Sequence, residues 1–298
     1  MMRTLVVGWF SFNEMGASAG DLMACELACE WLKSAGRPYD VGWAPPFTGG
    51  VDWTKVDPHT YSDVIFVCGP FGNGWPITDF LPRFAGCRLI GLDLTMLEPL
   101  TAWNPFALLW ERDSSRTTRP DISFLGDRPL VPIVGLVLID TQPEYGSNAA
   151  HQMANDALRR LAASRGVAAV SIDTRLDTNT TGLHSAPQVE SLIARMDVVL
   201  TTRLHGTVLA LKNGVPALAV DSVVGGGKIT RQAEVVGWPC LLQAGRFTDT
   251  ELEHAFDYCL SAAARVKARE CADRARAIVA QVRDEFIAAV TPAVDIGK

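Results

Sequence analysis

An arginine and a histidine stand directly after an apolar run, at Arg203 and His205. The run predicts a buried strand, and the residues after it predict a helix. In open α/β sheets, ligands bind where strand ends meet helix starts. An arginine at such a turn suits an anion, and a histidine suits proton transfer. Either residue alone also fits a structural role, in which Arg203 caps a carbonyl or His205 packs in its loop, but the pair favours function. The stretch reads Asp197-Val-Val-Leu-Thr-Thr-Arg203-Leu204-His205-Gly206-Thr207.

Strand-like and helical segments alternate on either side of this turn, which is typical of parallel sheets built from β-α-β units. A fresh strand begins at Leu130, just after the loop Gly126-Asp-Arg-Pro129. We therefore expect an α/β fold of two Rossmann-like domains, residues 1–128 and 129–298, with parallel sheets that face a cleft as in GT-B glycosyltransferases. Predicted strands cover residues 4–9, 39–43, 64–68, 88–92, 107–110, 130–139, 167–172 and 215–220, besides the run before Arg203. Predicted helices cover residues 21–35, 151–164, 208–212 and 248–290, and one more opens at Ser185-x-x-Gln188.

Composition excludes several classes of protein. The 298 residues carry a net charge of −6, which argues against a nucleic-acid partner. No apolar run approaches the ~18 residues of a membrane span, and the N-terminal run is too short for a signal peptide. The seven cysteines form no Cys-x-x-Cys pair. We expect buried, reduced thiols in a cytoplasmic protein, with Cys25 and Cys29 on one core face and no metal.

The turn at Arg203 also resembles a known family, the polysaccharide pyruvyl transferases. The resemblance is strongest over Asp197-Val-Val-x-x-x-Arg203-Leu204-His205-Gly206, Ala210-Leu211 and Gly214-Val215-Pro216. Weaker matches follow the family's order along the chain. They are Gly16-x-x-x-Gly20-Asp21, Ser62-Asp63 through Gly69-Pro-Phe-Gly72, Glu111-Arg112-Asp113-Ser114-Ser115 and Arg119-Pro120-Asp121. The sequence departs from the family at Cys68-Gly69-Pro70, where a triple glycine is usual, and at Asp221 to Lys228, where Tyr-Asp-x-Lys is usual.

The resemblance implies an enzyme of exopolysaccharide biosynthesis that moves a pyruvyl group from phosphoenolpyruvate to a pair of sugar hydroxyls, leaving a pyruvate ketal. Phosphoenolpyruvate carries a carboxylate and a phosphate, so its site needs several cations together with an acid–base group. It would serve as donor substrate, with no cofactor, and the acceptor would be a sugar on a polysaccharide, a lipid carrier or a nucleotide. The expected catalytic residues are His205, Arg203 and Arg112, with His184 in reserve for proton transfer. The expected substrate-binding residues are Lys228, Gly206, Thr207, Asn13, Gly16, Asp21, Gly69 and Gly72.

Several of these residues have structural alternatives. Arg112 could form an ion pair with Asp113 or Glu111, and Asp21 could cap the following helix. The run Gly225-Gly-Gly-Lys228 is no P-loop, because Ser222 and Ile229 stand where that motif needs a glycine and a hydroxyl residue. A loop that brings Lys228 over an anion stays open beside a plain solvated loop.

Seven of the eight tryptophans lie in the first 110 residues. Trp43, Trp53 and Trp75 stand in loops, where they could stack on a sugar or a base or merely pin the loops. This asymmetry suggests that the N-terminal half binds the acceptor and the C-terminal half the donor. Two rival functions stay open, a GT-B glycosyltransferase that uses a nucleotide sugar and a binding protein that has lost the chemistry.

Overall fold

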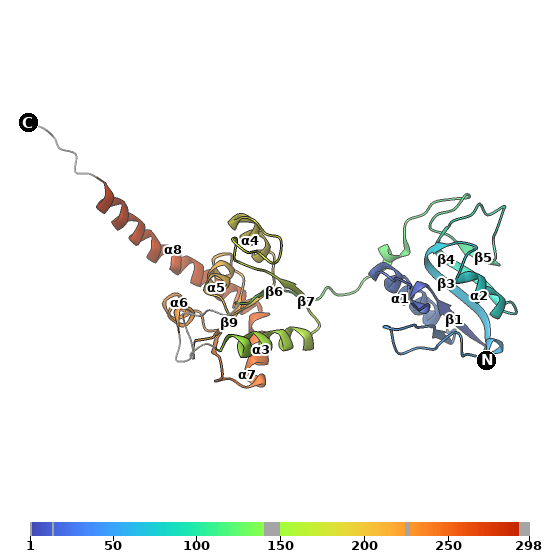
Figure 1. Ribbon diagram of the computed structural model, residues 1–298, viewed down its shortest axis with the longest axis horizontal. Helices are drawn as coiled ribbons and strands as arrows, with labels where there is room; N and C mark the ends of the chain where they lie inside the picture. Colours follow the sequence, from blue (N-terminus) through green and yellow to red (C-terminus); the bar gives the residue numbers. More distant parts are fainter. Residues whose placement is uncertain (1, 14, 140–149, 224–226, 292–298) are drawn as a thin grey trace, which may run out of the picture. The chain divides into compact units, whose positions relative to one another are not determined.

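A computed structural model describes residues 2–13, 15–139, 150–223 and 227–291. The chain divides into two compact units, unit 1 (Met1–Arg128) and unit 2 (Pro129–Lys298). Each unit carries its own five-stranded parallel sheet with helices packed against it (Figure 1). The predicted fold class, two Rossmann-like α/β domains with parallel sheets, is confirmed.

Unit 1 is built on the sheet β2-β1-β3-β4-β5. The side chains of Leu5, Val6 and Val7 are fully buried, as expected for a strand covered on both faces of a parallel sheet. The strands are β1 (Arg3–Val7), β2 (Tyr39–Val41), β3 (Tyr61–Phe71), β4 (Arg88–Met96) and β5 (Leu108–Trp110), and the α-helices are α1 (Ala19–Ser34) and α2 (Ile77–Arg83).

Unit 2 is built on the sheet β10-β9-β8-β6-β7. Its strands are β6 (Ile133–Val137), β7 (Ala168–Ser171), β8 (Val198–Thr201), β9 (Ala217–Asp221) and β10 (Leu241–Gln243). Its described helices are α3 (His151–Ser164), α4 (Ala186–Ile193), α5 (Leu204–Lys212), α6 (Lys228–Val236), α7 (Asp249–Cys259) and α8 (Ala262–Val290).

The two sheets share one topology. Counted from the first strand of each unit, both run in the order 2-1-3-4-5. In such a sheet the connections leave the first strand in opposite directions, so a crevice forms at the carboxyl ends of the first and third strands. These switch points lie between β1 and β3 in unit 1 and between β6 and β8 in unit 2, and they are the expected ligand sites.

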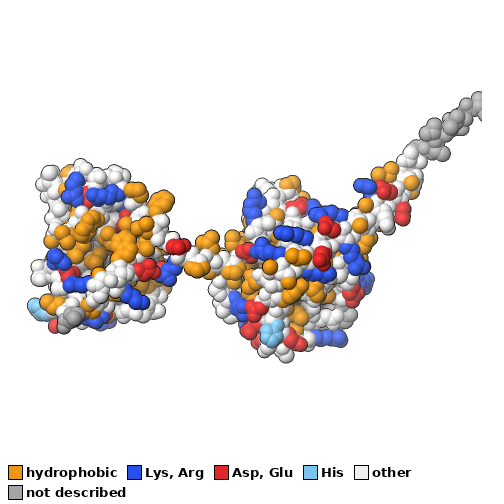
Figure 2. Space-filling model, turned by 180° about the vertical axis from the view of Figure 1, so that it is seen from behind, with side chains coloured by type: hydrophobic (Ala, Val, Ile, Leu, Met, Phe, Trp, Pro, Cys, Tyr) orange, Lys and Arg blue, Asp and Glu red, His pale blue; other side chains and the backbone are white. Residues whose placement is uncertain are grey.

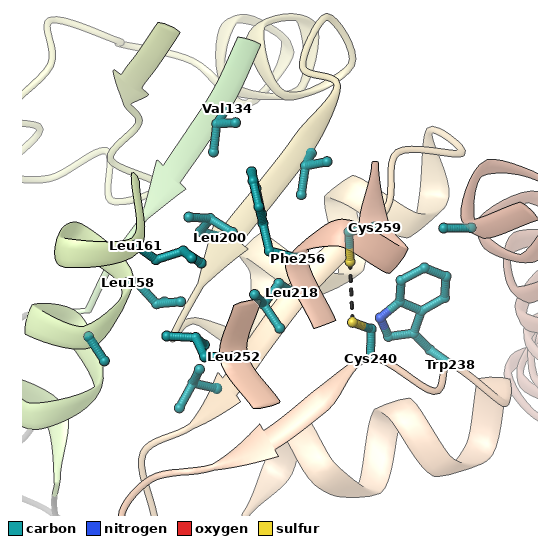
Figure 3. Close-up of a cluster of buried hydrophobic side chains, with 14 of the residues drawn as sticks. Val134, Leu158, Leu161, Leu200, Leu218, Trp238, Cys240, Leu252, Phe256 and Cys259 are labelled. Carbon is teal, nitrogen blue, oxygen red and sulfur yellow. Dashed lines mark hydrogen bonds between the residues drawn. The ribbon is translucent and has the colours of Figure 1, made fainter. Parts of the chain in front are cut away.

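Each hydrophobic cluster of the described chain draws its residues from one unit only. In unit 2, Phe256 packs among leucines from α3, β8 and β9 (Figure 3). The thiols of Cys240 and Cys259 lie 3.2 Å apart within this cluster. All seven cysteines are free thiols, and burial is complete or partial for each. Cys25 is buried and Cys29 half-buried on successive turns of α1.

The structure corrects several details of the sequence prediction. The tail is two helices rather than one, because Ser261 caps a new helix by accepting the Ala264 N–H at 3.1 Å. Asp21 is not the first cap of α1. Ser18 takes that position, and Asp21 completes its capping box from the third helical position. The elements α2, α6 and β10 were not predicted, since each is short or follows a glycine run.

Apolar side chains are exposed on part of unit 1, and Figure 2 shows them gathered on the face of that unit seen there. A groove on unit 1 is lined mostly by apolar residues of the sheet, Trp110 among them, together with Trp31 of α1. None of the described helices combines the length and the apolar character that a membrane span needs.

Candidate functional site

Arg203 follows β8 and precedes α5, at the switch point of unit 2. Its Nε donates to the carbonyl of Leu138 at 2.8 Å, and its Nη2 lies 3.8 Å from Oδ1 of Asp173. Leu138 directly follows β6, and Asp173 lies just beyond β7. The guanidinium is thus held by the ends of neighbouring strands, and only 13% of its side chain is exposed.

A buried hydrogen-bond network holds the turn beneath Arg203. Thr201 Oγ1 accepts the Arg203 N–H at 2.9 Å and donates to the carbonyl of Val137 at 2.8 Å. Thr202 Oγ1 accepts the Ile139 N–H and donates to Asn155, each at 2.9 Å. Buried hydrogen bonds of this kind are costly to break, so the loops after β6 and β8 are held in one arrangement.

Three predicted site residues line one small cavity of about 110 Å³ beside this turn. We call it the Arg203 pocket, and its charged or polar lining includes Arg203, His205, Lys228, Asp221 and Ser222. His205 stands in the first turn of α5 and Lys228 in the first turn of α6, and both side chains are exposed. Two cations, an imidazole and two helix starts therefore surround one cavity, which suits a small anion.

Asp221 is a site residue that the sequence prediction missed. Its buried carboxylate accepts N–H groups from Gly227 at 2.7 Å and Thr230 at 3.0 Å, and the Thr230 hydroxyl at 2.7 Å. Desolvation raises the pKa of Asp221, but these donors and the Val223 N–H outweigh it, and the pKa is lowered. The ionised carboxylate caps α6 and so positions Lys228, the first residue of that helix.

Asp173 was also missed. It is 7% exposed and accepts N–H groups from Arg175 and Thr180 at 2.9 and 3.1 Å. Desolvation raises its pKa, whereas these donors and the charge of Arg203 lower it, and the lowering prevails. Neither aspartate stood out in the sequence, because an Asp that ends a strand is equally typical of a plain turn.

Gly206 and Thr207 were both expected to bind substrate, but the structure gives each of them a structural role. A Cβ on Gly206 would lie 2.2 Å from Thr201 Oγ1, so this glycine permits close packing of α5 on β8. Thr207 is buried, and its N–H donates to the Arg203 carbonyl at 3.2 Å inside the helix. The Thr207 N–H is therefore not among the free N–H groups at the start of α5 that could hold a phosphate. The N–H groups of the preceding helical residues are the ones at the helix start.

In unit 1, Arg112 pairs with neither of the acids that the sequence suggested. Its Nη1 donates to Asp121 at 2.7 Å and lies 4.0 Å from Asp93, and its Nη2 donates to Thr95 at 3.0 Å. Glu111 instead binds other arginines of the same segment. Arg112 thus joins the two segments around residues 111–115 and 119–121, and its side chain is 28% exposed. Its role in catalysis stays a prediction.

Arg112 also lies beside Cys68. The possible ligand atoms of Cys68, Asp93 and Asp121 all lie within 4.8 Å of one another. Among the described residues this is the one group of three that could hold a metal ion. Burial and the charge of Asp121 raise the pKa of Asp93 to about 6. Arg112 already supplies positive charge to these carboxylates, and the expectation of no metal stays a prediction.

The other predicted residues of unit 1 lie in different surroundings. Asn13 is exposed and lines a second pocket at the carboxyl ends of β1 and β2. Gly16 has open space where a Cβ would stand. Gly69 has a φ of +86°, and a Cβ there would lie 2.4 Å from Trp9. A Cβ on Gly72 would lie 2.9 Å from Leu97, so both later glycines are explained by packing.

His184, the reserve candidate for proton transfer, is exposed and is not among the residues that line the Arg203 pocket. Its backbone N–H donates to the side chain of Gln188 at 2.7 Å. In a capping box Gln188 would accept the N–H of Ser185, but here it accepts the N–H of the preceding residue, His184.

Comparison with solved structures finds likenesses along the whole chain at low identity. The spinosyn rhamnosyltransferase SpnG, complexed with thymidine diphosphate, is 13% identical with a TM-score of 0.37, covering 96% of this chain and 100% of that one. The calicheamicin glycosyltransferase is 12% identical with a TM-score of 0.34, covering 98% and 100%. The HepE protein of Anabaena, in complex with UDP, is 15% identical with a TM-score of 0.35, covering 97% and 100%. Likenesses this distant carry no conclusion about function.

No curated protein matches the chain in sequence. The model of one family does match, over residues 89–222, somewhat less than half of the chain. The matched stretch begins in β4, includes Arg112, and ends with Asp221 and Ser222 of the Arg203 pocket. The resemblance inferred from the Arg203 turn is thereby confirmed, since residues 89–222 match the model of the polysaccharide pyruvyl transferase family.

Proposed function

We propose that this protein transfers a pyruvyl group from phosphoenolpyruvate to a pair of hydroxyls on a sugar of a polysaccharide or its precursor, giving a pyruvate ketal. One observation carries the proposal. Arg203, His205 and Lys228 line a single cavity at the switch point of unit 2, inside the stretch matched by the family or close to its end. The donor would bind there, in the cytoplasm where phosphoenolpyruvate is available.

The size and charge of the Arg203 pocket support a small donor. Its volume of about 110 Å³ is below the ~300–1,000 Å³ of pockets that enclose larger ligands. Arg203 presents a planar fork that matches a carboxylate or a phosphate, and Lys228 adds a second cation. Asp173 lies 3.8 Å from Arg203, and Asp221 caps the helix that Lys228 begins, so the two carboxylates orient these cations beside the cavity.

The proposed mechanism follows from this arrangement. His205 donates a proton to the methylene carbon of phosphoenolpyruvate, and positive charge develops at the substituted carbon. The first sugar hydroxyl adds to that carbon and loses its proton to the imidazole. The C–O bond to the phosphate then breaks, and the second hydroxyl closes the ketal as its proton passes to the departing phosphate. Arg203, Lys228 and the start of α5 hold the carboxylate and the departing phosphate throughout.

The test is a turnover assay with the full chain. Phosphoenolpyruvate and a panel of sugars, free and on nucleotide or lipid carriers, are incubated with the protein, and phosphate release and ketal formation are followed by mass spectrometry. We expect phosphate to be released in step with the ketal. Turnover of nucleotide sugars without use of phosphoenolpyruvate would replace the proposal with a glycosyltransferase. Binding of phosphoenolpyruvate without any product would indicate a binding protein.

A further inference from the structure

Unit 1 holds a pocket of its own, lined by residues from the segments that follow β1, β2 and β3. Its volume is about 460 Å³, within the range of ligand pockets in proteins, ~300–1,000 Å³. We call it the tryptophan pocket. It is lined by Trp43, Trp53 and Trp75, together with the polar residues Asn13, Asp52, Lys55 and Asp79.

Two of the three indoles are held firmly. Trp53 Nε1 donates to the carbonyl of Ser11 at 2.9 Å, and its ring packs 5.4 Å from Phe12 between centroids. The Trp43 ring lies 4.7 Å from Phe10. These contacts fix the orientation of both rings, so they offer preformed apolar walls at small entropic cost to a ligand.

Trp75 differs from its two neighbours because 67% of it is exposed. It stands just before α2, in the loop that follows β3. A tryptophan with an open indole face beside polar groups is suited to stack on a flat ligand with a partly apolar face.

The charged groups of the pocket select among such ligands. Hydrogen bonds from Thr54 and Lys55 lower the pKa of Asp52 to about 2, so it is ionised near neutral pH. Lys55 Nζ lies 2.9 Å from Asp52, which offsets that charge. Asp79 adds a second carboxylate in the first turn of α2. Carboxylates accept hydrogen bonds from hydroxyls but repel phosphates.

From this chemistry we propose that the tryptophan pocket binds a neutral pyranose, with the sugar stacked on Trp75 and its hydroxyls bonded to Asp79, Asp52 and Asn13. A nucleotide or a second phosphoenolpyruvate would meet two carboxylates here, and Lys55, the one cation of the lining, is already paired with Asp52. Sugar binding here does not depend on the reaction in unit 2. Its role as the acceptor subsite does rest on the proposed function, and it would mean that the acceptor sugar is recognised through an uncharged ring.

The experiment measures binding to the full chain without phosphoenolpyruvate. The methyl glycosides of glucose, galactose and mannose are titrated while tryptophan fluorescence and saturation-transfer NMR are recorded, and UDP serves as the anionic probe. We expect at least one glycoside to bind, and Trp75→Ala to weaken it about tenfold, as the loss of one aromatic contact would. Asp79→Asn should weaken it as well, and this conservative change at an exposed helix position preserves the fold.

The matched control is Trp110→Ala, which removes a tryptophan that is 52% exposed on β5, outside the pocket. It should leave glycoside affinity unchanged. The proposal is overturned if no glycoside binds, if Trp75→Ala and Asp79→Asn bind as tightly as the parent, or if UDP displaces the glycoside. Glycoside binding by a chain that never turns over phosphoenolpyruvate would keep this site and refute only the proposed reaction.

Discussion

Arg203 and Asp173 face each other at the carboxyl edge of the second sheet, with Nη2 and Oδ1 3.8 Å apart. The distance is long for an ion pair, because the Arg203 Nε is already bonded to the Leu138 carbonyl and Asp173 to backbone N–H groups. Backbone groups thus hold each partner in addition to the charge of the other, and together they limit the rotation of the guanidinium.

Replacement of Arg203 by lysine should weaken phosphoenolpyruvate binding by roughly tenfold or more, since one charge-assisted hydrogen bond contributes about 1.5–3 kcal/mol. An ammonium cannot bond to the Leu138 carbonyl and also present a planar fork to an anion. Isothermal calorimetry at low and at moderate salt measures the affinity and its screening. Arg246→Lys, at an exposed position outside the Arg203 pocket, is the control. Equal affinity in Arg203→Lys and the control would remove Arg203 from the donor site.

His205→Asn should leave the fold and the binding of phosphoenolpyruvate intact and reduce turnover by at least about 100-fold. The reason is that His205 is exposed, so its loss removes little packing, whereas an amide cannot relay a proton. Melting temperature, calorimetry and the rate of phosphate release are compared between the two proteins. Normal turnover, or a large fall in melting temperature, would make His205 a structural residue.

Gly206→Ala should destabilise unit 2 by about 1–3 kcal/mol, because the new Cβ would lie 2.2 Å from Thr201 Oγ1 and 2.8 Å from Val137 Cγ1. Gly16→Ala is the matched control, since nothing lies within 4 Å of its added Cβ. Chemical denaturation of both variants measures the difference. Should Gly206→Ala be as stable as Gly16→Ala, the close packing of α5 on β8 would be refuted.

Asp93 should make unit 1 less stable as pH rises. Burial and the charge of Asp121 raise its pKa to about 6, from about 4 in an unfolded chain, so the folded state binds its proton more tightly. The resulting stability is present below about pH 4 and is lost as pH rises through 6. Asp93→Asn resembles the protonated acid. Its free energy of unfolding should therefore exceed that of the parent by up to about 3 kcal/mol at pH 8 and should equal it at pH 4. A gain of the same size at both values would contradict the raised pKa.

Much of the fold could be predicted, because parallel strands and amphipathic helices leave periodic apolar patterns. Helix α3 begins and ends at the predicted residues, His151 and Ser164. Short elements with no full period, such as β10, could not be found in this way. The same limit applies to helices that begin through tertiary contacts. Helix α6 depends on the carboxylate of Asp221, which lies before the glycines and not at the usual cap position.

In the Arg203 pocket, too, the sequence revealed the residues that stand out in a local pattern and missed those that come together only through the fold. Arg203 and His205 were visible because they interrupt an apolar pattern at a strand end. Asp173 was not, since its relation to Arg203 exists only when β7 and β8 flank β6 in the sheet. The partner of Arg112 was missed for a similar reason. Nearby acids in sequence suggested an ion pair, but the chain folds back and brings Asp121 to it instead.

The confinement of every described hydrophobic cluster to a single unit has a thermodynamic consequence. Each unit can melt as its own cooperative transition, and a ligand raises only the transition of the unit that it binds, in proportion to RT ln(1 + [L]/Kd). One calorimetric scan then shows which unit binds a ligand as well as how tightly the ligand binds. Phosphoenolpyruvate should move the transition that Gly206→Ala lowers, and a neutral glycoside should move the other.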